Sequence, residues 1–143
     1  MPAGRWIVHD DFKYKLGNKE ISLVSDLYEV RLFTSGSNIS DTATGDATSA
    51  TNEVVNAGYA AQSVTPSWVQ SGSTSKFDVS DATFTPSGLD LTARYAALIN
   101  TSVTPNLVCA HCLLDETDQD VIIPNAQSVD ILVPSAVIDI SGV

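Results

Sequence analysis

Short alternating segments, each ended by turn residues, repeat along the sequence and narrow the range of possible folds. Residues 27–33 alternate so that Tyr28 and Leu32 fall on one face, because successive side chains of a strand point to opposite faces. Turn residues recur at 71–73, 86–88 and 104–106. Short strands at this spacing are typical of an antiparallel β-sandwich, jelly roll or barrel. We therefore expect an all-β fold in which residues 1–143 form a single domain.

Two longer apolar segments in the second half of the chain are expected to be strands as well. Residues 107–114 are nearly all apolar, which is typical of a central strand that is covered on both faces. Residues 89–100 show a run of apolar side chains in period two, which predicts one strand with one apolar face. These side chains are Leu91, Ala93, Tyr95, Ala97 and Ile99.

Only one short helix is expected, near the start of the chain. Asp10 and Asp11 can cap its first turn, and Gly17 is the residue type that commonly follows a helix end. The chain contains a single Met and few Lys and Arg residues, which leaves little material for long helices. We expect this helix near residues 11–16, with strands and loops in the rest of the chain.

Residues 34–51 are polar and carry no alternating pattern. Ile39 is their one large apolar residue, and loops of this length in a compact domain are usually functional or disordered. This segment and residues 1–5 lack the apolar spacing needed to dock on the core. Ordering them costs about 1–2 kcal/mol per residue in backbone entropy. We expect both segments to be mobile in the free protein and ordered against a partner in an assembly.

The charge balance argues against several classes of partner. The formal net charge is −10, from 17 acidic and 7 basic side chains. Nucleic-acid backbones and anionic membranes both favour basic surfaces, so neither is an expected partner. No stretch approaches the ~18 apolar residues of a membrane span, and residues 1–5 show no basic region followed by an apolar run. We expect a protein made in a cytosol, with Cys109 and Cys112 as thiols.

Cys109, His111 and Cys112 have the residue types of a metal site. Two thiolates and an imidazole suit tetrahedral zinc, but a structural zinc needs four ligands and the only other histidine is His9. A redox Cys-x-x-Cys normally begins a helix, whereas this one lies in a predicted strand. Strict alternation places Cys109 and His111 on one face and Cys112 on the other. We therefore expect packed or surface side chains here and no bound metal.

Residues 115–120 (Asp-Glu-Thr-Asp-Gln-Asp) offer carboxylates of the kind that calcium prefers. They lack the sixth-position glycine and distal glutamate of an EF-hand, so we expect a solvated hairpin loop. A Ser-His-Asp triad could draw on His9 or His111, but no Gly-x-Ser-x-Gly nucleophile elbow is present. We expect no catalytic, cofactor-binding or metal-binding residues. The aromatic side chains of the strands are expected in the core, namely Trp6, Trp68, Phe77, Phe84 and Tyr95.

A series of short motifs runs through most of the chain in a defined order. They are residues 12–17 (Phe-Lys-Tyr-Lys-Leu-Gly), 26–35 (Asp-Leu-Tyr-Glu-Val-Arg-Leu-Phe-Thr-Ser), 52–54 (Asn-Glu-Val), 58–59 (Gly-Tyr), the strand with Trp68, 82–85 (Ala-Thr-Phe-Thr) before Gly88, 92–96 (Thr-Ala-Arg-Tyr-Ala) and 113–115 (Leu-Leu-Asp). This order of strands and turns resembles small virion structural proteins of tailed bacteriophages. The resemblance implies a non-enzymatic part of a phage particle.

The leading expectation is a capsid decoration (cement) protein that binds the major capsid protein and copies of itself as a homo-oligomer. Such a protein is made in the host bacterial cytoplasm and ends on the surface of the virion. A neck, tail or head-fibre component is a second hypothesis from the same resemblance. A carbohydrate-binding or receptor-binding module is a third, and it requires exposed aromatic side chains. A hydrolase is a fourth hypothesis, but the sequence offers it no site, and fold alone decides among none of these.

Overall fold

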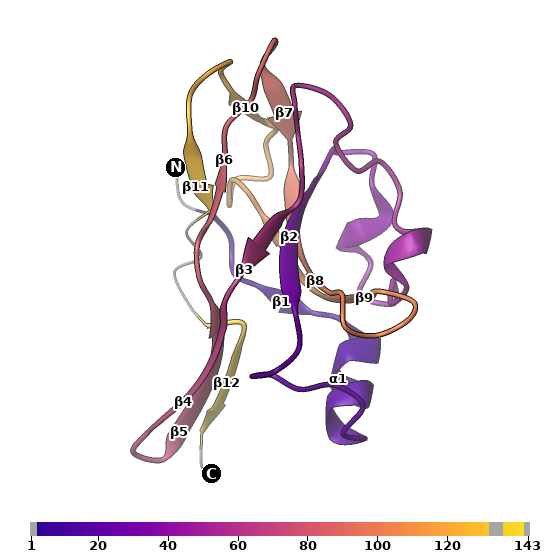
Figure 1. Ribbon diagram of the computed structural model, residues 1–143, viewed down its shortest axis with the longest axis vertical. Coiled ribbons are helices and arrows are strands. Elements are labelled where there is room, and N and C mark those ends of the chain that lie inside the picture. Colours follow the sequence, from indigo (N-terminus) through magenta and orange to yellow (C-terminus); the bar gives the residue numbers. More distant parts are fainter. Residues whose placement is uncertain (1–2, 132–135, 142–143) are drawn as a thin grey trace.

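A five-stranded antiparallel sheet forms one layer of the fold, with the strand order β1-β9-β8-β2-β3 (Figure 1). The computed structural model describes residues 3–131 and 136–141. The strands of this sheet are β1 (Ile7–Val8), β2 (Tyr28–Phe33), β3 (Gln62–Val64), β8 (Tyr95–Asn100) and β9 (Leu107–Leu113). Strand β9 lies between β1 and β8 and is buried along nearly all of its length.

Three smaller antiparallel sheets form the second layer. β7 (Leu91–Ala93) pairs with β10 (Val121–Ile123), and β6 (Ala82–Phe84) pairs with β11 (Val129–Ile131). The third sheet contains β4 (Pro66–Ser71), β5 (Thr74–Val79) and β12 (Ile138–Ser141), with β5 in the middle. One α-helix, α1 (Asp10–Gly17), occurs in the described residues. The predicted all-β fold with one short N-terminal helix is confirmed.

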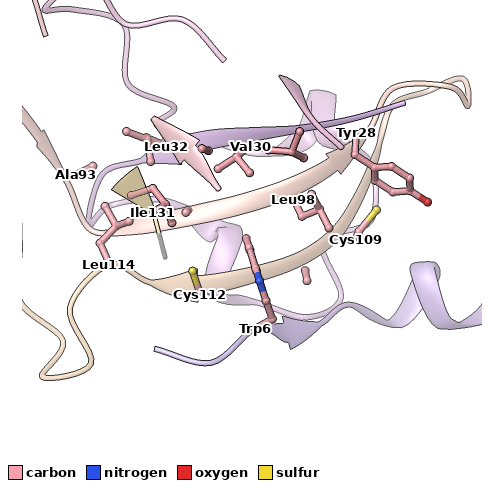
Figure 2. Close-up of a cluster of buried hydrophobic side chains, with 14 of the residues drawn as sticks. Trp6, Tyr28, Val30, Leu32, Ala93, Leu98, Cys109, Cys112, Leu114 and Ile131 are labelled. Atoms are coloured by element: carbon pink, nitrogen blue, oxygen red, sulfur yellow. The ribbon is translucent and has the colours of Figure 1, made fainter. Parts of the chain in front are cut away.

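The main core lies between these two layers (Figure 2). The alternation predicted for β2 is observed, because Tyr28, Val30 and Leu32 all point into this core and are at most 2% exposed. Phe77 of β5 faces them from the second layer, with its ring centroid 5.5 Å from that of Tyr28. α1 closes one end of the core through Phe12, which is fully buried and lies 6.3 Å from Phe77 between ring centroids.

A second, smaller core lies on the opposite face of the five-stranded sheet. Its members on the sheet are Phe33, Ala97, Ile99 and Val108. Residues 34–51 cover them, and Ile39 from this segment is fully buried. The expectation that the segment cannot dock on its own protein is therefore wrong. One large apolar side chain, together with the small Ala47, is enough to anchor it.

The backbone of the covering segment finds hydrogen-bond partners within the segment and also at Asn106 and Val108, which explains how a polar sequence stays packed. The segment contains two single-turn 3₁₀-helices, at Asn38–Ser40 and Ala47–Ser49, whose N-cap residues are Ser37 and Asp46. The side chains of Ser37 and Asp46 accept hydrogen bonds from backbone N–H groups at the start of these helices. The abundance of Ser, Thr and Asp, which suggested mobility, instead supplies the partners of a fixed loop.

Residues 3–5 are likewise held, contrary to the expectation for the start of the chain. The backbone N–H of Gly4 donates to the carbonyl oxygen of Leu113 at 2.8 Å. Ala3 is 6% exposed. Residues 1–2, which belonged to the same expectation, lie outside the described residues.

Strict alternation fails at Arg94, which separates β7 from β8. The backbone N–H of Arg94 donates to the carbonyl oxygen of Phe33 at 2.8 Å. The carbonyl oxygen of Arg94 accepts from the backbone N–H of Leu114 at 2.9 Å. Leu91 and Ala93 point into the main core before this residue, whereas Ala97 and Ile99 point into the second core after it. The single strand predicted over residues 89–100 is therefore two strands, whose apolar faces belong to different cores.

Ile39 provides a test of how the covering segment is held. We expect Ile39→Ala to lower the free energy of unfolding by about 2–4 kcal/mol, because the substitution leaves a cavity in a fully buried position. Urea unfolding followed by tryptophan fluorescence measures the change. Val55→Ala is the matched control, since Val55 is 94% exposed and its loss should change stability by less than about 0.5 kcal/mol. Equal effects of the two substitutions would contradict this packing.

Candidate functional site

The Cys-x-x-Cys motif does not converge on one site. Cys109 and Cys112 both lie in the main core, whereas His111 points to the other face of the sheet. The predicted placement of Cys109 with His111 is wrong, because the strand pairing shifts by one residue. Leu98 pairs with Ala110 but the next residue of β8 pairs with Val108, which leaves Cys109 as the extra residue of a β-bulge. The bulge reverses the alternation for the rest of β9.

Both thiols are free and fully buried. Burial raises the pKa of Cys112 to about 12 and raises the pKa of Cys109 further still. In the parts of the chain that the structure describes, no three His, Cys, Asp or Glu side chains gather in a metal-binding arrangement. The expectation that no metal binds at Cys109, His111 and Cys112 remains a prediction.

His111 takes part in a different arrangement, a buried pair with His9. The Nε2 atom of His9 lies 2.9 Å from Nδ1 of His111, and Nδ1 of His9 lies 2.7 Å from the carbonyl oxygen of Thr44. A carbonyl oxygen can only accept, so His9 carries its proton on Nδ1 and donates it to Thr44. Nε2 of His9 then accepts the Nδ1 proton of His111. This chain of hydrogen bonds ties the covering segment to β9.

Burial keeps both imidazoles neutral. Desolvation lowers the pKa of His9 below its usual value of 6.5. Desolvation, together with the neighbouring His9, lowers the pKa of His111 to about 4. Sequence reasoning did not find this pair, because the two residues are 102 positions apart and no spacing links them.

The acidic run at residues 115–120 forms an exposed turn after β9. The expected hairpin is not formed, since β10 pairs with β7 and not with β9. Asp115 accepts a hydrogen bond from the backbone N–H of Thr117 at 2.9 Å, which stabilises the turn. Arg94 reaches the run from the β7–β8 junction, with Nε 2.8 Å from Asp120 and a terminal nitrogen 3.5 Å from Asp118. The carboxylates of Asp115, Asp118 and Asp120 therefore stabilise the fold through these contacts.

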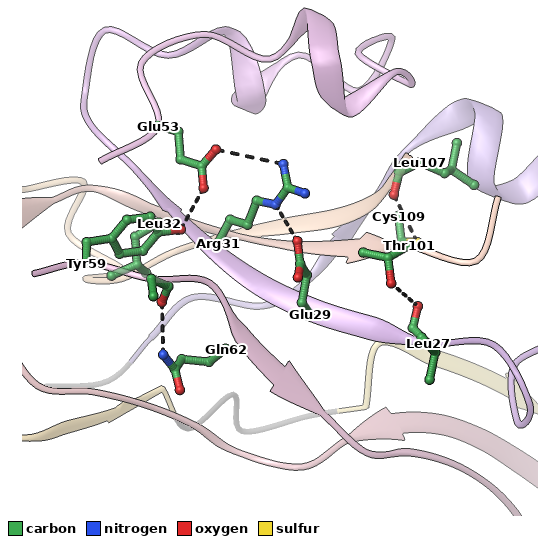
Figure 3. Close-up of polar contacts among 11 residues, drawn as sticks. Leu27, Glu29, Arg31, Leu32, Glu53, Tyr59, Gln62, Thr101, Leu107 and Cys109 are labelled. Carbon is green, nitrogen blue, oxygen red and sulfur yellow. Dashed lines mark hydrogen bonds and ion pairs between the residues drawn. The ribbon is translucent and has the colours of Figure 1, made fainter. Parts of the chain in front are cut away.

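A second polar network holds the segment that follows the covering loop (Figure 3). Arg31 on β2 contacts Glu29 at 2.6 Å and Glu53 at 3.8 Å. The hydroxyl of Tyr59 donates to Glu53 at 2.9 Å and accepts from the backbone N–H of Leu32 at 3.0 Å. The network is internally paired, so its charges serve to position this segment against β2.

The feature that remains open to a partner is an apolar groove between α1 and β12. It encloses about 360 Å³ and is lined mainly by Val8, Leu16, Ile138 and Ile140, with Lys13 beside it. Ile140 is 53% exposed. Large apolar side chains left open in this way are typical of surfaces that contact other molecules.

The three-stranded sheet beside the groove extends beyond the rest of the protein (Figure 1). Its edge strand β4 is exposed from Ser67 to Ser71, and Trp68 is 38% exposed. The expectation of a buried Trp68 is therefore wrong, because β4 is an edge strand and leaves Trp68 partly uncovered, although Trp68 lies directly opposite the buried Phe77. Trp6, Phe77 and Phe84 are buried as expected, and Tyr95 is half-buried.

Comparison of the chain with protein-family models, with curated proteins and with solved structures found no match. No helix in the described part of the chain is long and apolar enough to cross a membrane.

The histidine pair provides a test of the buried network. We expect His111 to titrate near pH 4 in the folded protein, and His9 to titrate below 6.5. As the pH falls below 6.5, the two histidines bind protons in the unfolded chain before they do so in the folded protein. The stability that the buried neutral pair contributes is therefore complete above pH 6.5 and is lost towards pH 4. NMR titration of the imidazole C–H signals measures both values, with the urea-unfolded protein as control. Titration of both residues at 6.5 in the folded protein would contradict the structure.

The two thiols provide an independent test of how completely β9 is buried. Native Cys109 and Cys112 should resist an aromatic disulfide reagent at neutral pH, because both are fully buried and their pKa values are raised. The protein unfolded in urea should release two thiols at once. Rapid labelling of Cys109 in the native protein would show that it does not point into the core.

Proposed function

We propose that the protein is a non-enzymatic structural subunit of a tailed-bacteriophage particle, and specifically a capsid decoration protein that binds the major capsid protein. The order of strand and turn motifs along the chain supports this proposal through its resemblance to small virion structural proteins. In the proposed role the subunit bridges neighbouring capsid subunits and strengthens the shell. Many weak contacts on a symmetric lattice then give a high total affinity.

The structural observation that carries the proposal is the projecting sheet of β4, β5 and β12. Its outer strands β4 and β12 have no further strand partner in the described residues, and α1 leaves a groove beside it. Exposed edges and apolar surface are what a subunit needs to pair with neighbours. The histidine and cysteine side chains, which are residue types used in catalysis, point into the protein instead. His9, His111, Cys109 and Cys112 are at most 4% exposed and hold the fold together.

Two other roles use the same surface. A neck, tail or head-fibre component also needs exposed edges, so the resemblance supports it equally. A carbohydrate-binding or receptor-binding module gains support from one observation, the exposed ring of Trp68, on which a sugar could stack. Location in the particle separates these roles from capsid decoration.

The test compares phage particles with and without the protein. Particles that lack it should form full heads but release their DNA at a lower temperature, because the shell loses the bridges that resist internal pressure. Addition of the purified protein should restore the release temperature, and heat-denatured protein serves as the control. Unchanged release would contradict capsid decoration. Normal heads without attached tails would instead support the neck or tail role.

A further inference from the structure

The exposed apolar side chains are concentrated at the end of the protein that contains the groove. We call this region the groove end and define it as residues 7–27, 66–79 and 138–141. It holds less than a third of the chain but seven of the ten exposed large apolar side chains in the described residues. These seven are Ile7, Tyr14, Val24, Leu27, Trp68, Val69 and Ile140, whereas Val55, Leu89 and Ile122 lie elsewhere.

The strand register shows which of these side chains share one face. Trp68 and Ile138 both lie directly opposite Phe77, so all three point to the same side of the sheet. Phe77 is fully buried in the main core, which identifies this side as the inner one. Ile140 follows Ile138 by two residues and lines the groove from the same side. The inner face is therefore apolar along the row from Trp68 to Ile138, and Ile140 extends it along β12. The residues level with Ile140 on the other two strands, Ser75 and Gln70, are polar.

The charge of the protein differs sharply between the groove end and the rest. The groove end contains all four lysines and six of the carboxylates, whereas the remaining chain has three arginines against eleven carboxylates. Lys13 lies 3.0 Å from Asp10, and Lys76 lies 3.9 Å from Asp139. The groove end is thus nearly neutral in a protein of net charge −10.

This charge distribution selects the occupant of the groove. Two copies that meet through any other surface bring strongly acidic regions together, and like charges that face each other oppose association. Two copies that meet through their groove ends keep those acidic regions apart. The same contact covers the exposed apolar side chains of the inner face in both copies, whereas Val69 points to the outer face of β4. A contact between identical surfaces is self-complementary and closes as a two-fold dimer.

We propose that two copies of this chain associate through their groove ends, with each copy covering the groove between α1 and β12 of the other. The exposed inner-face side chains Trp68 and Ile140 lie in this contact. The proposal concerns the isolated protein, so it does not depend on the phage assignment.

The test is sedimentation velocity of the purified protein over a range of concentrations. The wild type should form a dimer, and Ile140→Asp should weaken the dimer by at least about tenfold, because it places a charge in an apolar contact. Ile122→Asp is the matched control, since Ile122 is 62% exposed on β10, outside the groove end, and should dimerise as the wild type does. Circular dichroism and thermal unfolding check that each variant folds.

Salt dependence is the second measurement. Added salt should strengthen the dimer, because it screens the repulsion between two acidic subunits that meet through apolar surface. A wild type that stays monomeric, a higher oligomer, an Ile140→Asp variant that dimerises normally, or a dimer weakened by salt would each overturn the proposal. Dimerisation without any effect on phage heads would instead contradict only the proposed function.

Discussion

The five-stranded sheet is buried on both of its faces, and the other elements are arranged so that they cover these two faces. A strand such as β9 can be apolar on both sides only if something covers each side. The smaller sheets cover one side and residues 34–51 cover the other. The covering segment is therefore an integral part of the core, although its composition is that of a surface loop. Its contacts with Phe33, Ile99 and Val108 explain why those side chains can be apolar.

Sequence reasoning recovers those parts of the fold in which one local pattern continues without interruption. The alternation of β2 is enough to predict that strand. Asp10, Asp11 and Gly17 correctly mark the place of α1, although the two carboxylates lie inside its first turn and Gly17 is its last residue. Sequence reasoning fails where a single residue reverses the order in which the side chains of a strand face the two sides of the sheet. Neither Arg94 nor Cys109 carries a local signal that a strand switches faces there, because the switch depends on which neighbouring strand pairs with it. Long-range pairing, and not local preference, decides those positions.

The candidate functional surface shows the same limit. Alternation around Phe77 predicts an apolar face for β5, but nothing local shows that β4 is the edge strand of this sheet and leaves Trp68 exposed. The sequence offers His9 and His111 as members of a triad or a metal site, whereas the structure joins them to each other. Composition does predict the charge of the protein. The segregation of lysines at the groove end becomes meaningful only when the fold brings α1 and β5 to the same end.

The bulge at Cys109 shows how β9 serves two cores without losing its pairing. Leu98 lies opposite Ala110 and Ile99 lies opposite Val108, so the extra residue adds length to β9 alone. Removal of Cys109 would leave both pairs in place, with Val108 still packed beside Ile39 and Ala110 still in the main core. The main core would lose one thiol, and β9 would lose its local bend. A strand one residue shorter at this position therefore keeps the same side chains buried.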